Sequence, residues 1–114
     1  MLDAIRDAAI DVIAAAANQT PETVLAMTQQ RHPQLDAHQI LYKAWRVLLE
    51  PDEYGPSPNV AICTEPILRA YYRTMDADDQ KSEGSEDRFF KEQRNAIFPR
   101  HGLEVPGLFN KLFG

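Results

Sequence analysis

Several features that would point to a particular function are absent from this sequence or nearly so. Its 114 residues hold a single cysteine, Cys63, which cannot form a disulfide within the chain, as is usual in a reducing compartment. No apolar run approaches the ~18 residues of a membrane-spanning helix. Acids at Asp3, Asp7 and Asp11, with no basic segment before them, disfavour a signal peptide. We therefore expect a soluble, cytoplasmic protein of bacterial type that does not bind membranes.

Basic residues are also fewer than acidic ones. The chain has 12 basic and 17 acidic residues, a formal net charge of −5 and a pI of about 5.1. The surplus of acid is present in both halves: residues 1–50 carry six acids and four bases, and residues 51–114 carry eleven acids and eight bases. Since attraction to phosphate normally dominates nucleic-acid affinity, this balance disfavours DNA as a partner.

No group of residues forms a recognisable catalytic or metal site. The three histidines do not share metal-ligand spacing with one another or with the cysteine. The acidic stretch 76–87 matches a calcium-binding loop in part, but Lys81 stands where such a loop needs glycine. There is no glycine-rich phosphate loop and no G-x-S-x-G motif. We expect no enzymatic activity, no cofactor and no bound metal.

What the sequence does contain is helix patterning. Apolar residues recur at intervals of three and four through most of the chain, which is the spacing of amphipathic helices. Several of these patterns are preceded by a side chain that can accept a hydrogen bond from the first free backbone N–H groups. The predicted caps are Thr20, Asp36, Thr64 and Ser85.

These patterns predict an all-α fold, a small orthogonal bundle of four to five short helices in a single domain spanning residues 1–114. One short isolated strand is allowed at residues 60–63, the only short apolar run outside the helix patterns. A flexible, exposed acidic loop is expected at residues 76–85. The C-terminal tail, residues 105–114, is apolar and is expected to dock on this domain, on a second copy or on a partner.

The stretch from residue 20 to residue 50 contains two predicted helices separated by a short turn. The turn Pro33-x-Leu35-Asp36, followed by apolar residues at 40, 44 and 47, resembles the helix-turn-helix of winged-helix repressors, including the ferric-uptake-regulator type. That resemblance implies a DNA-binding transcriptional regulator, which we keep as the alternative function.

The second helix of this pair departs from the repressor pattern at the positions that would read DNA. Gln39 stands where that family has threonine, Leu41 where it has tyrosine and Tyr42 where it has arginine. Only Lys43 and Arg46 are cationic on the predicted helix, whereas recognition helices carry several polar or basic side chains toward bases and phosphates. A protein partner is therefore preferred to DNA.

Large apolar side chains exceed what a core of this size comfortably needs. Aromatic side chains near an arginine are typical of the residues that anchor protein interfaces. The predicted protein-binding residues are Leu41, Tyr42, Trp45, Arg46, Leu49, Phe109 and Phe113. As a set they suggest a homodimer, a heteromeric interface, or both.

In length, acidity and short-helix layout the chain is similar to the small antiactivators that silence LuxR-type quorum-sensing regulators. The resemblance implies a homodimeric regulatory protein that sequesters a transcription factor and blocks its dimerisation or DNA binding. It also implies that helix 36–49 is the contact element. The expected mechanism is occlusion of a surface that the target needs for its own assembly.

Overall fold

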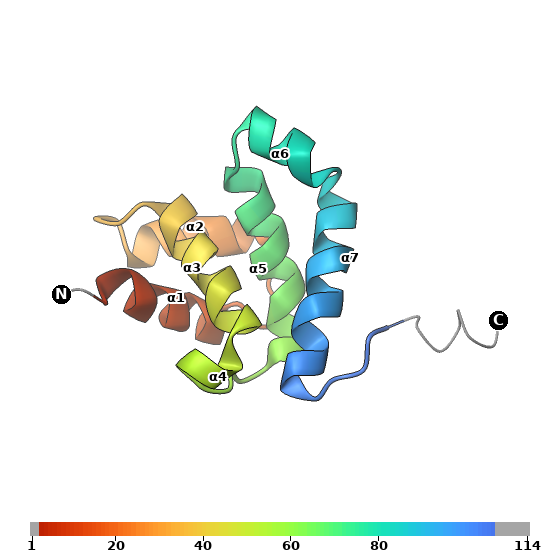
Figure 1. The fold of residues 1–114 in the computed structure, drawn as a ribbon. Coiled ribbons are helices and arrows are strands. Elements are labelled where there is room, and N and C mark those ends of the chain that lie inside the picture. Colours follow the sequence, from red (N-terminus) through yellow and green to blue (C-terminus); the bar gives the residue numbers. More distant parts are fainter. Residues whose placement is uncertain (1–2, 107–114) are drawn as a thin grey trace.

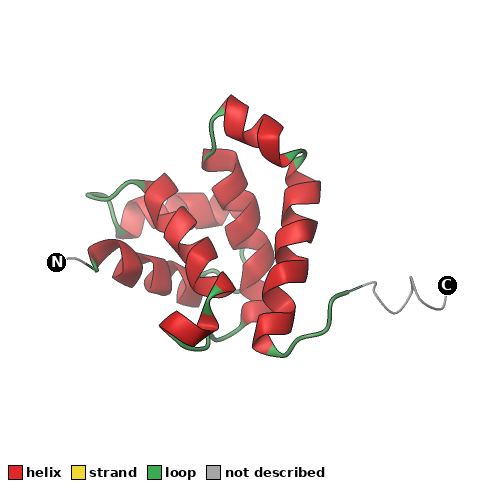
Figure 2. Cartoon of the chain, in the orientation of Figure 1, coloured by secondary structure: helices red, strands yellow, loops and turns green. Residues whose placement is uncertain are grey.

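The computed structural model describes residues 3–106, and every regular element in that range is a helix (Figures 1 and 2). Seven α-helices and one 3₁₀ helix follow in this order: α1 (Ala4–Ala15), α2 (Pro21–Arg31), α3 (Ala37–Leu49), α4 (Pro51–Tyr54), α5 (Val60–Thr74), α6 (Ala77–Glu83), α7 (Glu86–Ile97) and η1 (Phe98–His101). The predicted all-α class is confirmed, although the helices are more numerous than the four to five expected.

Three of the predicted helix starts are confirmed by their capping hydrogen bonds. The Thr20 hydroxyl accepts from the backbone N–H of Thr23 at 3.1 Å, and Pro21 occupies the first turn of α2. The Asp36 carboxylate caps α3, and the Ser85 hydroxyl caps α7. Each cap satisfies an N–H group that has no partner within its own helix.

The short strand that the sequence allowed at residues 60–63 is not formed, and the cap predicted at Thr64 is wrong. These residues form the first turn of α5, which begins directly after Asn59. A single strand would leave its backbone groups unpaired, whereas a helix satisfies them internally. The Thr64 hydroxyl instead donates to the Val60 carbonyl oxygen within the helix, at 2.7 Å.

The segment expected to be an exposed acidic loop, residues 76–85, contains a helix. Residues 77–83 form α6, capped by the Asp76 carboxylate, which accepts from the backbone N–H of Asp79 at 2.9 Å. The acidic residues at the start of this segment suit a helix N-terminus, where the backbone dipole is positive. The proline-rich stretch after α3 contains the single turn α4, which starts at Pro51. These two elements account for the excess over the predicted helix number.

A proline inside α5 links this helix to the turn between α1 and α2. Pro66 has no N–H, so the Ile62 carbonyl oxygen lacks its usual partner in the helix. That oxygen accepts a hydrogen bond from the backbone N–H of Asn18 at 3.1 Å. Asn18 has a positive φ of 61°, a conformation that asparagine tolerates better than most residues. The unpaired carbonyl of one helix is thereby satisfied by a distant turn.

Helix α3 lies at the centre of the molecule, packed most extensively on α1 and α5 (Figure 1). Helix α5 in turn packs on α2 and α7, so these two central helices connect the outer ones. The α3 residues Ile40, Leu41, Ala44 and Leu48 are fully buried. Because the core occupies so much of α3, only one side of this helix is available for function.

Candidate protein-binding surface

The solvent side of α3 carries a mixture of aromatic and cationic side chains. Tyr42 is 43% exposed, one of the largest exposures of any bulky apolar residue in the described chain. Trp45, Arg46 and Leu49 are each partly buried and continue along the same helix. We call these four residues the α3 face. Their exposed atoms lie on one rigid element, which suits a preformed contact surface.

Beneath the α3 face, rings from three helices form an aromatic cluster of Tyr42, Trp45, Tyr71 and Phe89. Trp45 stacks on Tyr71 of α5, with ring centroids 5.5 Å apart and planes inclined by 18°. Tyr42 meets Trp45 edge to face at 5.6 Å, and Phe89 of α7 lies 6.4 Å from Trp45. The quadrupoles of aromatic rings favour stacked and edge-to-face arrangements of this kind. The cluster thus extends from the buried core to the surface, where Tyr42 is its exposed member.

Hydrogen bonds fix the position of the α3 face. The indole Nε1–H of Trp45 donates to Oε1 of Gln93 on α7 at 3.0 Å. At the end of α3, the Arg100 guanidinium donates to the Leu49 carbonyl oxygen at 3.0 Å, and Nε2 of His101 donates to that of Leu48 at 2.8 Å. These donors satisfy carbonyl groups that a helix C-terminus leaves free. The face is therefore held at both its middle and its end.

The predicted binding residues do not all lie at the surface. Leu41 is 0% exposed and belongs to the core, so it cannot contact a partner while the protein is folded. The helical period explains the error: Leu41 is one residue before Tyr42 and therefore points in a different direction. Phe109 and Phe113 lie outside the described residues. The structure brings together Tyr42, Trp45, Arg46 and Leu49, as the α3 face.

Two contributors to this site, Tyr71 and Gln93, were not among the predicted binding residues. Tyr71 lies in the apolar pattern of α5, which marks it as buried but not as the base on which Trp45 stacks. Gln93 lies on α7, 48 residues after Trp45. No local pattern could have paired them, because the contact depends on how α3, α5 and α7 pack.

The cations of α3 are already engaged within the chain. Arg46 pairs with Glu50 at 3.1 Å, and its guanidinium lies 5.6 Å from the Trp45 ring centroid. Lys43 Nζ lies 3.2 Å from the Tyr54 hydroxyl and over the Tyr54 ring. Six of the chain's eight arginines form ion pairs with carboxylates. Most arginines of the described chain therefore already have a carboxylate partner within the chain.

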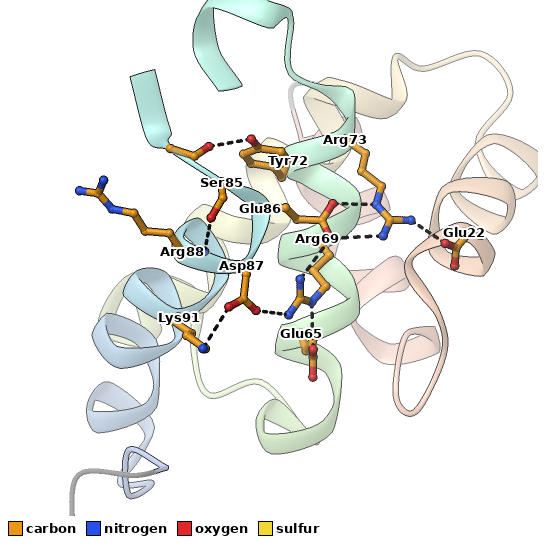
Figure 3. Close-up of polar contacts among 11 residues, drawn as sticks. Glu22, Glu65, Arg69, Tyr72, Arg73, Ser85, Glu86, Asp87, Arg88 and Lys91 are labelled. Atoms are coloured by element: carbon orange, nitrogen blue, oxygen red, sulfur yellow. Dashed lines mark hydrogen bonds and ion pairs between the residues drawn. The ribbon is translucent and has the colours of Figure 1, made fainter. Parts of the chain in front are cut away.

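An ion-pair network ties α2, α5 and α7 together (Figure 3). Arg73 of α5 contacts Glu22 of α2 at 2.6 Å and Glu86 of α7 at 2.8 Å. Arg69 lies one turn earlier and contacts Glu86 at 3.1 Å and Asp87 at 2.9 Å. Because Glu86 receives both guanidinium groups, it is the central acceptor of the network.

The paired carboxylates make stability depend on acid pH. The hydrogen bond from Arg73 lowers the pKa of Glu86. In a separate ion pair, the hydrogen bond from Arg31 is the main cause that lowers the pKa of Asp11 from 3.8 to about 2. A carboxyl whose folded-state pKa lies below its unfolded value stabilises the fold above the unfolded value and loses that contribution as pH falls.

We therefore expect the melting temperature, followed by circular dichroism, to fall as the pH decreases from about 5 to about 2. Asp11 contributes about 1 kcal/mol after allowance for solvent screening. Asp11→Asn should flatten the part of the decline below pH 3.8. A melting temperature that stays constant down to pH 2 would contradict this assignment.

The histidines have hydrogen-bond partners in this fold, and the cysteine is buried. His32 Nε2 lies 2.8 Å from Asp11 Oδ2, and His38 Nδ1 lies 2.8 Å from the Thr74 hydroxyl. Burial raises the pKa of the Cys63 thiol to about 11, so it stays protonated near neutral pH. Within residues 3–106, no three potential ligands gather into a metal-binding group.

The described chain has shallow surface depressions. One of them, of about 530 Å³, is open to solvent and lies beside η1. Its lining is Pro51, Pro56, Ser57, Asn59, Val60, Ala61, Arg100, His101 and Leu103, where Arg100 and His101 are occupied in capping α3. Among the described helices, none has the length and apolar character needed to cross a bilayer.

Comparison with known proteins adds no further assignment. No protein-family model matches the chain, and searches of curated proteins and of solved structures likewise find no match.

Proposed function

We propose that this chain is a small regulatory protein that acts by binding another protein through the α3 face. The observation that carries the proposal is the position of Tyr42, an aromatic side chain 43% exposed above a rigid aromatic cluster. Aromatic groups supported in this way supply contact area with little loss of conformational entropy. A neighbouring arginine completes the composition typical of interface anchors.

The proposed mechanism is occlusion. The α3 face covers a surface that the partner uses for its own assembly, so binding prevents that assembly without any chemical step. The similarity of layout to quorum-sensing antiactivators makes a transcription factor the proposed partner and a homodimer the proposed active form. The acidic balance of the chain and the engagement of its α3 cations favour such a protein partner over DNA.

The test compares two substitutions with matched exposure. Tyr42→Asp introduces a charge into the α3 face, whereas Ile10→Asp introduces one on α1 at an equally exposed apolar residue, 44% against 43%. We expect Tyr42→Asp to weaken binding of the partner captured from the source organism's lysate by at least about 30-fold, as for an interface hot spot of 2 kcal/mol or more. Ile10→Asp should leave it within about two-fold.

Both variants should remain folded and keep the circular dichroism spectrum of the parent, because both side chains are more than two-fifths exposed. A loss of about 1 kcal/mol in each would lower the melting temperature by about 4–8 °C. Partner binding that survives Tyr42→Asp at parental strength would rule out the α3 face as the contact. Equal loss in both variants would point to a different surface or to general charge repulsion.

A further inference from the structure

The three histidines of the chain differ in how their ring nitrogens are engaged. In His32 and His101 the Nε2 atom has a hydrogen-bond partner within the chain, a carboxylate and a backbone carbonyl respectively. In His38 the engaged atom is Nδ1, which lies 2.8 Å from the Thr74 hydroxyl, and Nε2 has no partner in the described chain. The buried side-chain nitrogen and oxygen atoms that lack a partner there comprise only Nε of Arg6. Nε2 of His38 is therefore not sealed inside this part of the fold.

The end of α5 determines which nitrogen of His38 carries the proton. The Met75 N–H closes the helix on the Tyr72 carbonyl oxygen. The Tyr71 carbonyl oxygen instead accepts a hydrogen bond from the Thr74 hydroxyl at 2.6 Å. A hydroxyl has one hydrogen, so the Thr74 oxygen can only accept from the imidazole. Nδ1 of neutral His38 is therefore the protonated nitrogen, and Nε2 carries a free lone pair.

The His38 ring adjoins the α3 face. His38 is one helical turn before Tyr42, so the two side chains lie on the same side of α3. Both rings contact Tyr71 of α5, with centroid separations of 5.5 Å for His38 and 6.0 Å for Tyr42. Trp45 stacks on the same tyrosine ring. A hydrogen-bond acceptor thus stands next to the exposed aromatic surface.

We propose that His38 is a further contact residue of the partner-binding surface, and that the partner places a hydrogen-bond donor, an N–H or O–H group, on its Nε2. An apolar side chain of the same protein segment covers Tyr42 and Trp45. This inference rests on the proposed function and specifies the chemistry of the partner at one point of the contact.

Desolvation is the physical reason for a donor at this position. Covering an imidazole nitrogen without replacing its water costs free energy, because the lone pair loses its hydrogen bond. An opposing carboxylate or carbonyl oxygen would add repulsion between lone pairs, since neither group has a hydrogen to offer. A donor restores the bond that water supplied. Because the contact with Thr74 already holds the ring, His38 loses little conformational freedom when it accepts that bond.

The tautomer of His38 can be measured in the free protein, where long-range proton–nitrogen NMR distinguishes a protonated ring nitrogen from a bare one. We expect His38 to carry its proton on Nδ1. We expect the opposite tautomer for His101, whose Nε2 donates to a carbonyl oxygen. The two histidines are thus compared within one spectrum. A proton on Nε2 of neutral His38 would overturn the inference, because that nitrogen could then not accept a hydrogen bond.

Binding is tested with His38→Asn and His38→Gln, which form a matched pair. Both substitutions remove the ring that contacts Tyr71. The shorter asparagine amide occupies the position of Nδ1 and keeps a donor toward Thr74, whereas the longer glutamine amide reaches the position of Nε2 and keeps an acceptor there. The probe is the protein that the parent chain captures from the lysate of its source organism, purified before titration. Circular dichroism checks that both variants are folded.

We expect His38→Asn to weaken binding of that protein at least about five-fold, the effect of leaving a covered donor unpaired, and His38→Gln to keep it within about two-fold. Equal weakening in both variants would show that only the ring matters. A greater loss in His38→Gln would show that only the contact with Thr74 matters. Either result overturns the inference, as does parental binding in both variants.

Tyr42→Asp separates this inference from the proposed function. Loss of binding in Tyr42→Asp together with parental binding in His38→Asn would leave the α3 face as the contact and remove the donor at His38. Parental binding in both of these variants, or capture of no protein by the parent chain, would remove both proposals. Loss in both, with parental binding in His38→Gln, would support both.

Discussion

Phe89→Ala is expected to lower the free energy of unfolding by about 3–5 kcal/mol, the usual cost of truncating a buried phenylalanine. Phe89 is 1% exposed and contacts three other rings, with centroids 6.0 Å from Tyr71, 5.8 Å from Tyr72 and 6.4 Å from Trp45. Its removal leaves a cavity where α5 and α7 meet beneath the α3 face. Because small domains have total stabilities of about 5–15 kcal/mol, this is a large fraction of the whole.

Urea unfolding followed by circular dichroism measures this loss, and Tyr42→Ala supplies the control. Tyr42 belongs to the same cluster but is 43% exposed, so its truncation should cost only about 1 kcal/mol, mostly from lost ring contacts. If Phe89→Ala were as mild as Tyr42→Ala, the cluster would not be the packed link between α3, α5 and α7 described above.

Leu41→Ala is the second substitution with a large expected effect, a loss of about 2–5 kcal/mol of stability. Leu41 is completely buried on α3, the helix that packs on both α1 and α5. Leu41→Met, which nearly conserves volume, should cost less than about 1.5 kcal/mol. Thermal and urea denaturation of the three proteins give the comparison directly.

The consequence for binding separates Leu41 from its neighbour. A partner titration corrected for the folded fraction should give nearly the parental affinity for Leu41→Ala, whereas Tyr42→Asp loses affinity while staying folded. A Leu41→Ala protein of parental stability with weakened binding would restore Leu41 to the interface and contradict its burial.

Local signals allowed much of the fold to be predicted. The caps at Thr20, Asp36 and Ser85 act within three residues along the chain, so the sequence alone is enough to place them. The start of α5 was missed because its first turn consists of four residues whose apolar run also fits a strand. The helix at residues 77–83 was missed because it has no apolar stripe and its polar composition is also typical of a loop.

The candidate site was predicted only as far as its helix. Tyr42 and Trp45 were identified from α3 itself, because surplus aromatic residues on one helix are visible in the sequence. Their separation into an exposed ring and a half-buried one depends on Tyr71 and Gln93, which come from other helices. Burial is a property of the assembled core, and for that reason Leu41 and Tyr42 could not be told apart by composition.

The proline in α5 has a consequence for cooperativity. The Ile62 carbonyl oxygen, freed by Pro66, is bonded by the Asn18 N–H of the α1–α2 turn. Separating that turn from α5 would leave the oxygen without a protein partner, because Pro66 provides no N–H to replace it. Local opening at the turn is thereby coupled to the beginning of α5. We therefore expect the α1–α2 turn and the first turn of α5 to open together, although more than 40 residues of sequence separate Asn18 from Ile62.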